Sequence, residues 1–279
     1  MSGVSERGLG MELRKFRERA GMTCAQVGEV LGWSANTVSR MERGLRRDTR
    51  PDEVSALLAG MGVTGNERAM VMRMATGHRE QGWWEGTDTN LSDQARTYMA
   101  FEAKATNIVD VEPLLVPGLL QTPDYYRALL AACAIDPLDM NHRIARRLGR
   151  QVILDRPYAS FAFVVSELML RQPLGGHEVM ARQTRRLLKE ALRPNVSVLV
   201  LPTSVAAHPG LLGAFVVLEF ADEPPVVFVE GRQSAMFPEN PSEIETYRMA
   251  AESLVALALD QERSARVLDD IAEEHERAR

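Results

Sequence analysis

The chain has 279 residues, of which 45% are hydrophobic and 25% are charged. This composition is typical of a globular protein, and the length suggests about two domains at roughly 150 residues each. No stretch approaches the roughly 18 to 20 uncharged apolar residues of a membrane helix, and the polar start MSGVSERGLG lacks the apolar region of a signal peptide. We therefore expect a cytoplasmic protein without a membrane span. Because Cys24 and Cys133 lie far apart and form no CxxC or Cys/His spacing, neither a disulfide framework nor a zinc site is expected.

Charge is distributed unevenly along the chain, although the net charge is only −5. Residues 1–80 contain 13 basic and 10 acidic side chains, whereas residues 81–279 contain 20 basic and 28 acidic ones. The positive excess is concentrated in residues 40–50, where five arginines face only Glu42 and Asp48. This asymmetry predicts a polyanion-binding module joined to an acidic domain.

The first 80 residues are predicted to form five short helices. Thr23 and Ser34 are suitable N-caps for the second and third helices, which would end at Gly32 and Gly44. Pro51 suits the first turn of the fourth helix. The apolar residues expected to face a common core are Leu13, Phe16 and Ala20 in residues 10–20, Val54, Leu57 and Leu58 after Pro51, and Met70, Val71 and Met74 in residues 64–76.

A turn-rich segment at residues 82–92 indicates a domain boundary. We expect a first domain at 1–80, a linker at 81–93 and a second domain at 94–279. Thr122 and Asp136 are suitable N-caps in the second domain, each followed by a proline. Helices are predicted at 93–106, 123–134, 137–154, 178–192, 242–259 and 261–278, and strands at 159–168, 196–201, 215–220 and 226–230. This order predicts an α+β domain with a small sheet covered by helices.

The segment from Cys24 to Arg43 has the pattern of a helix-turn-helix. This motif needs a small residue where its two helices approach most closely and a turn residue four positions later, which Gly28 and Gly32 supply. The residues predicted to face inward are Val27, Leu31, Trp33, Val38 and Met41. The alternative is a packed helical hairpin with solvated charges. The offsets and the basic loop that follows favour the helix-turn-helix.

Burial of the inward positions would expose Ala35, Asn36, Ser39, Arg40 and Arg43 toward a DNA major groove. Asn36 has the donor and acceptor that read adenine, and Arg40 can reach guanine O6 and N7. Ser39 or Thr37 can bond a base edge or a phosphate. Phosphate contacts are expected from Arg43, Arg46 and Arg47. Ser34 and Gln26 complete the candidate DNA-binding residues.

The stretch LRKFRERAGMTCAQVGEVLGWSANTVSRMERG resembles the Cro/C1-type (XRE-like) helix-turn-helix domain of bacterial regulators. Three later segments, GWWEG, FEAKATNIVDVEPLLVPGLLQTPDYYRALL and PPVVFVEG, resemble actinobacterial regulators with a C-terminal DUF5753-type domain. The resemblance implies that Ser34 to Arg43 is the recognition helix and that Glu42 bonds within its own fold. It also shows a departure, because Cys24 stands where the family commonly places a DNA-contacting Gln. Gln26 lies two positions later, roughly 200° around the helix, so it does not automatically substitute.

The second domain has no recognisable catalytic, cofactor or metal motif. Its histidines are scattered, and no GxSxG elbow, Walker loop or GxGxxG occurs. Glu167, Glu219 and Glu230 at strand ends could serve acid–base chemistry, but solvated strand ends are the commoner arrangement. The segment LLVPGLLQTPDYY is predicted to be an ordered loop, either packed into the core or walling a pocket. The loop at 203–213 is a candidate partner surface or lid, and Trp83 and Trp84 are expected to pack between domains.

These observations predict a transcriptional regulator that binds double-stranded DNA as a homodimer. One recognition helix reads too few bases for useful specificity, so two would lie in successive major grooves about 34 Å apart. The second domain would receive input from a small partner protein, of acidic type according to the resemblance, or from a small-molecule effector. One alternative is an antitoxin-like adaptor that regulates only its own gene, and a second is a DNA-tethered enzyme.

Overall fold

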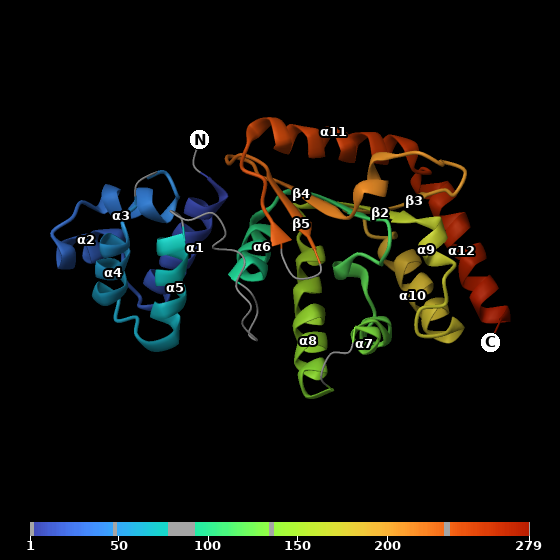
Figure 1. The fold of residues 1–279 in the computed structure, drawn as a ribbon, viewed down its shortest axis with the longest axis horizontal. Helices are drawn as coiled ribbons and strands as arrows, with labels where there is room; N and C mark the ends of the chain where they lie inside the picture. The colour runs from blue at the N-terminus through green and yellow to red at the C-terminus, as the bar shows by residue number, and fades with distance from the viewer. Residues whose placement is uncertain (1–2, 47–48, 78–92, 134–136, 232–234, 279) are drawn as a thin grey trace. The chain divides into compact units, whose positions relative to one another are not determined.

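The computed structural model describes residues 3–46, 49–77, 93–133, 137–231 and 235–278 (Figure 1). The chain divides into two compact units, the first comprising Met1–Lys104 with Glu230–Glu239 and the second Ala105–Val229 with Asn240–Arg279. The predicted fold class is confirmed, with a helical N-terminal region followed by an α+β region. Four predicted features lie outside the described residues, namely the boundary at 82–92, the packing of Trp83 and Trp84, the Asp136 cap and the place of Arg47.

The first unit contains the five helices predicted in residues 1–80 and the helix predicted at 93–106. They are α1 (Val4–Arg19), α2 (Cys24–Leu31), α3 (Ala35–Glu42), α4 (Pro51–Gly60), α5 (Gly65–Gly77) and α6 (Asp93–Lys104). Their inward faces share one core, which includes Val27, Val38, Met41, Leu57 and Val71. Short helices of this kind are stabilised mainly by such packing, because isolated helices of this length are marginal in water.

The prediction for α1 was wrong at its start and in one core residue. It began the helix at Gly10 and placed Ala20 in the core. The helix starts at Val4, its buried stripe is shifted one turn to Leu9, Leu13 and Phe16, and Ala20 is exposed. Gly10 lies inside the helix because the backbone of α3 passes close by: a Cβ on Gly10 would lie 2.5 Å from the carbonyl oxygen of Glu42. Gly10, which the prediction took as the start of the helix, is therefore a position of close backbone approach inside it.

The ends of α2 and α3 are determined by local hydrogen bonds that the sequence predicted. The Thr23 hydroxyl accepts a bond from the backbone N–H of Gln26 at 3.2 Å, and the Gln26 side-chain oxygen accepts one from the backbone N–H of Thr23 at 2.8 Å. Helix α2 ends at Gly32, whose φ of 69° is the left-handed conformation that glycine adopts without strain. The Ser34 hydroxyl caps α3 by accepting from the N–H of Thr37 at 3.0 Å.

The sheet has six strands in the order β3-β2-β1-β4-β5-β6. Strands β1, β2 and β3 are parallel, and β4 runs antiparallel to both β1 and β5. The strands are β1 (Asn107–Glu112), β2 (Ser160–Ser166), β3 (Val196–Leu201), β4 (Phe215–Glu219), β5 (Val226–Glu230) and β6 (Ala235–Met236). Four of them were predicted. Strand β2 is shorter than expected, because a turn of helix, α9 (Glu167–Leu170), begins where it ends.

Strand β1 was missed by the sequence analysis although it lies in the middle of the sheet. Its sequence, NIVDVE, places Asp110 among β-branched residues, and the helix predicted before it was extended to Thr106. In the structure α6 ends at Lys104, and the N–H of Thr106 donates to the carbonyl oxygen of Glu219 at 2.8 Å, which starts the pairing of β1 with β4. The short strand β6 was also not predicted.

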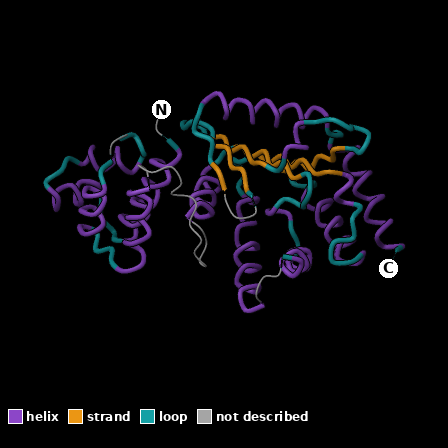
Figure 2. Tube along the Cα trace, in the orientation of Figure 1, coloured by secondary structure: helices purple, strands orange, loops and turns teal. Residues whose placement is uncertain are grey.

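Helices cover the sheet of the second unit. They are α7 (Pro123–Ala132), α8 (Pro137–Arg150), α10 (His177–Glu190), α11 (Pro241–Leu257) and α12 (Gln261–Arg277), with 3-10 turns at Gly118–Leu120, Gln151–Asp155 and Pro209–Leu212. Helix α11 lies along one side of the sheet, and α7, α8 and α10 lie on the other (Figures 1 and 2). The helix predicted at 137–154 ends at Arg150 and tightens into a 3-10 turn, as helix ends commonly do.

Helix α12 protects the edge of the sheet. Its Ser264 hydroxyl accepts a bond from the N–H of Val200 in β3 at 2.9 Å, and the N–H of Leu259 donates to the Val200 carbonyl oxygen at 2.9 Å. An exposed strand edge would otherwise be open to pairing with another chain. No helix in the described part of the chain is long and apolar enough to cross a membrane.

Candidate nucleic-acid interface

Helix α2 approaches the turn before α3 most closely at Gly28. Gly28 is buried in α2, and a Cβ there would lie 2.5 Å from the carbonyl oxygen of Trp33 in the turn. Val38 and Met41 on α3 are buried in the same core, with exposed fractions of 0% and 2%. This arrangement determines which face of α3 points outward, as the sequence predicted for a helix-turn-helix.

The outward face of α3 carries polar and basic side chains. Ser34, Ala35, Asn36, Arg40 and Arg43 are exposed. Asn36, Arg40 and Arg43 are spaced at i, i+4 and i+7, so they form one stripe about 10 Å long. A stripe of this length and chemistry matches the donors and acceptors on a few successive base pairs of a major groove.

Thr37 and Ser39 are less available than the other candidates. Both are half-buried, and the Thr37 hydroxyl lies 2.8 Å from the Ser34 hydroxyl. Because the hydroxyls of Ser34 and Thr37 bond each other at the N-terminus of α3, they position the start of the helix. That start also carries backbone N–H groups and the positive end of the helix dipole, which favour an approaching phosphate.

The predicted phosphate contacts differ in their surroundings. Arg43 is exposed, and its Nε donates to the carbonyl oxygen of Ser39 at 3.3 Å. Arg46 is half-buried and pairs with the carboxylate of Glu53 at 2.7 Å. Since Glu53 also accepts from the backbone N–H of Arg50 at the start of α4, Arg46 has a structural partner that the sequence analysis did not identify.

At the entry of α2, Gln26 and Cys24 lie in different environments. Gln26 is exposed, but its side-chain oxygen is used by the capping hydrogen bond to Thr23. Cys24 is half-buried against the core, and its Sγ lies 3.8 Å from the Glu42 carboxylate. Burial, and then the negative charge of Glu42, raises the pKa of the Cys24 thiol. Cys24 is therefore a packing residue of the first unit.

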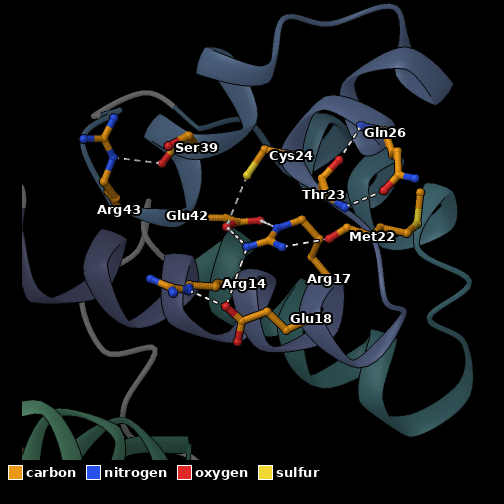
Figure 3. A network of polar contacts seen from close by, with 10 residues as sticks. All are labelled: Arg14, Arg17, Glu18, Met22, Thr23, Cys24, Gln26, Ser39, Glu42 and Arg43. Carbon is orange, nitrogen blue, oxygen red and sulfur yellow. Dashed lines mark hydrogen bonds and ion pairs between the residues drawn. The ribbon is translucent and has the colours of Figure 1, made fainter.

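Glu42 is locked inside the first unit, as the resemblance implied. Its two carboxylate oxygens accept from Nε and a terminal nitrogen of Arg17 at 2.6 and 2.9 Å (Figure 3). Arg17 also donates to the carbonyl oxygen of Met22. The hydrogen bond to Glu42, and then the negative charge of that carboxylate, raises the pKa of the Arg17 guanidinium. The bidentate pair ties the C-terminal turn of α3 to α1.

The role of Arg17 was not predicted from the sequence. Like Arg14, Lys15 and Arg19, it lies outside the apolar stripe of α1. In the structure its side chain is only 13% exposed. A signal was available, because Glu42 needs a cationic partner if it bonds within its own fold, but nothing in the sequence distinguishes Arg17 from its neighbours.

The strand-end carboxylates of the second unit are mostly engaged in the structure. Glu167 accepts a hydrogen bond from the N–H of Thr203 at 2.9 Å and pairs with Arg171. The bond from Thr203, and then the contacts with Arg171, lower the pKa of Glu167. Glu219 pairs with Arg248 at 3.2 Å. Glu230 is exposed at the end of β5. Glu167 and Glu219 thus hold neighbouring segments together.

The segment LLVPGLLQTPDYY packs into the core, which is the first of the two arrangements predicted for it. Val116, Leu119 and Leu120 are at most 1% exposed. The N–H of Val116 donates to the phenolic oxygen of Tyr125 at 3.1 Å, and burial raises the pKa of Tyr125 to about 12. In the loop at 203–213, by contrast, Leu211 and Leu212 are exposed, which is compatible with a partner surface.

Two family models match consecutive parts of the chain. A model described as a helix-turn-helix domain matches residues 9–70, and a model described as a domain of unknown function (DUF5753) matches residues 95–270. Neither a curated protein nor a solved structure matches the chain.

Proposed function

The chain belongs to the DUF5753 family and carries a helix-turn-helix domain, and from this we propose that it is a sequence-specific transcriptional regulator that acts by binding DNA. The observation that carries the proposal is the outward stripe of α3. It combines an amide and two guanidinium groups, Asn36, Arg40 and Arg43, on a helix whose opposite face is buried.

The stripe suggests a division of roles. Arg40 lies in the last turn of α3 and reads a guanine through a bidentate contact, and Asn36, in the first turn, reads an adenine. Arg43 lies at the C-cap and contacts a phosphate, which holds the helix in register without reading sequence. Arg46 and Arg47 add positive charge in the loop that follows, and the pairing of Arg46 with Glu53 makes its contribution to phosphate binding smaller than that of Arg43.

We propose that the protein binds as a homodimer. A single α3 helix contacts only a few base pairs, and two copies related by a twofold axis would read an inverted repeat with half-sites about 34 Å apart. The proposal follows from the size of the recognition helix and from the specificity that a regulator needs.

The second domain is proposed to receive the regulatory signal from a small acidic partner protein or ligand, without itself catalysing a reaction. Helix α8 supports an anionic partner because Arg143, Arg146 and Arg147 lie within two turns, and within the described part of the chain none pairs with a carboxylate. Burial lowers the pKa of Arg146, and its arginine neighbours lower it further. An acidic partner would relieve this repulsion.

The experiment is recovery of genomic DNA fragments by purified full-length protein at a stated near-physiological salt. Wild type should recover a short inverted repeat. Arg40→Ala should lose about 1 to 3 kcal/mol on that repeat and relax its sequence preference. As the matched control on the same helix, Arg43→Ala should weaken all sequences alike and reduce the slope of log affinity against log salt by about 1.

Two outcomes would contradict the proposal. Unselective or absent recovery by wild type would favour the adaptor alternative, in which the second domain's partner is the main target. Equal effects of Arg40→Ala and Arg43→Ala across a panel of sites would refute the assignment of base and phosphate roles.

A further inference from the structure

Helix α1 meets the C-terminal end of the recognition helix with no space between them. A Cβ on Gly10 of α1 would lie 2.7 Å from the Met41 carbonyl oxygen and 2.5 Å from that of Glu42. A Cβ on Gly44, just after α3, would lie 2.7 Å from the backbone nitrogen of Arg7. Because backbone meets backbone at both glycines, α3 cannot keep its place if α1 moves.

Another side of α1 contacts α6, within the same compact unit. Gly8 is the closest point, where a Cβ would lie 3.0 Å from the Cγ2 methyl of Thr97. One residue earlier, the Arg7 guanidinium lies over the ring of Phe101 at 4.9 Å from its centroid. Both Thr97 and Phe101 are buried, with exposed fractions of 4% and 0%.

Residues 235–239, which comprise β6 and the three residues after it, also contact α6 and α1. The rings of Phe237 and Phe101 pack with centroids 6.3 Å apart. The Ser5 hydroxyl, at the start of α1, donates to the Glu239 carboxylate at 3.1 Å. Residues 235–239 and α6 therefore form one support for the N-terminal half of α1, although more than 130 residues separate them in the chain.

This support belongs to the span that matches DUF5753. It contacts the start of α1, and α1 continues from there into the span that matches the helix-turn-helix domain, residues 9–70. Arg7 takes part in both contacts, with Phe101 through its guanidinium and with Gly44 through its backbone. A rigid helix with close contacts on two sides transmits a displacement from one side to the other, because packed interfaces do not deform continuously.

We propose that α6 and residues 235–239 hold the recognition helix in its DNA-binding position through α1, so that a signal that displaces α6 releases DNA. The proposal rests on the proposed function and deepens it, since it names the structural route by which the second domain regulates binding. The docked state is the binding-competent one.

The test is Gly8→Ala in the full-length chain. The added methyl group pushes against Thr97, while alanine favours helix formation in α1 itself. Gly149→Ala is the matched control, because Gly149 is also helical and a Cβ there meets nothing within 4 Å. Thr97→Ala added to Gly8→Ala removes the atoms that the new methyl group meets, and should restore the wild-type behaviour.

Amide hydrogen exchange is measured over α6 and over residues 34–44, together with affinity for the recovered DNA site. Gly8→Ala should raise exchange about threefold in both segments and weaken DNA binding by a similar factor, since mutations along a coupled contact change affinity modestly. Phe101→Leu, which loosens the same contact from α6 without altering α1, should do the same. Gly149→Ala should change neither measurement.

If Gly8→Ala raises exchange in α6 but leaves exchange in residues 34–44 unchanged, the proposal is overturned. It is also overturned if Gly8→Ala leaves exchange in α6 unchanged. The exchange measurement needs no DNA, so it decides the coupling even if wild-type protein selects no DNA site. Failure of DNA selection would count against the proposed function, and failure of coupled exchange against this inference.

Discussion

The pair formed by Arg17 and Glu42 illustrates how single residues position the recognition helix. Both side chains are largely removed from solvent, and the guanidinium meets the carboxylate through two hydrogen bonds. A buried charge that loses its partner is costly, because water no longer compensates it. Glu42 therefore serves to attach the end of α3 to α1, whereas Asn36, Arg40 and Arg43 of the same helix are exposed.

Arg17→Met should lower the free energy of unfolding of the first unit by about 3 kcal/mol, because it leaves the Glu42 carboxylate buried without a cation. Urea titration at neutral pH measures the change. The control is Arg14→Met, since Arg14 pairs with Glu18 on the same helix but both side chains are more than half exposed. That variant should change the free energy by less than about 0.5 kcal/mol. Similar effects of the two substitutions would show that the Arg17 pair is not special.

At the scale of the elements, glycines and caps determine where the helices lie. Thr23, Ser34 and Gly32 determine the ends of α2 and α3 through hydrogen bonds within a few residues, and these ends were predicted. Gly10, by contrast, acts through a contact with residues far away in sequence, and the start of α1 was predicted wrongly. Local hydrogen bonds are readable from sequence, whereas close approach of two backbones is not.

Gly28→Ala should destabilise the first unit by about 2 kcal/mol and abolish selection of the DNA site, because the methyl group would overlap the Trp33 carbonyl oxygen. That oxygen is in the turn, so relieving the overlap must rotate α3 relative to α2. Unfolding in urea and DNA recovery measure the two effects. Gly149→Ala again provides the control and should be neutral or stabilising by up to about 1 kcal/mol. A fully active Gly28→Ala protein would contradict the placement of this contact.

For the whole molecule, the central question is how many copies bind one site. The first unit offers a single recognition helix, which contacts few base pairs, and the second unit supplies the other 165 residues, Ala105–Val229 and Asn240–Arg279. The proposed homodimer would gain specificity by placing two copies on one stretch of DNA, at a spacing set by the helical repeat of the duplex.

Inserting half a helical turn, about 5 base pairs, between the two half-sites should weaken binding at least about tenfold, because the second half-site rotates to the opposite side of the duplex. Inserting a full turn of about 10 base pairs keeps both half-sites on one side and should restore part of the affinity. Gel-shift titrations measure affinity, and the mass of the complex gives the number of chains. Binding that ignores the insertion, or one chain per site, would argue for a monomer.

The sequence by itself determined the division into a helical and an α+β region, the five N-terminal helices, and the outward face of α3. These features follow from helical periodicity, turn glycines and capping residues, all of which act over a few positions. Only the tertiary structure decided which arginine neutralises Glu42, that Arg46 pairs with Glu53, that β1 lies at the centre of the sheet, and that α6 packs on α1. Each depends on residues brought together from distant parts of the chain, and several side chains of the same type could satisfy the same chemical requirement until the packing selects one.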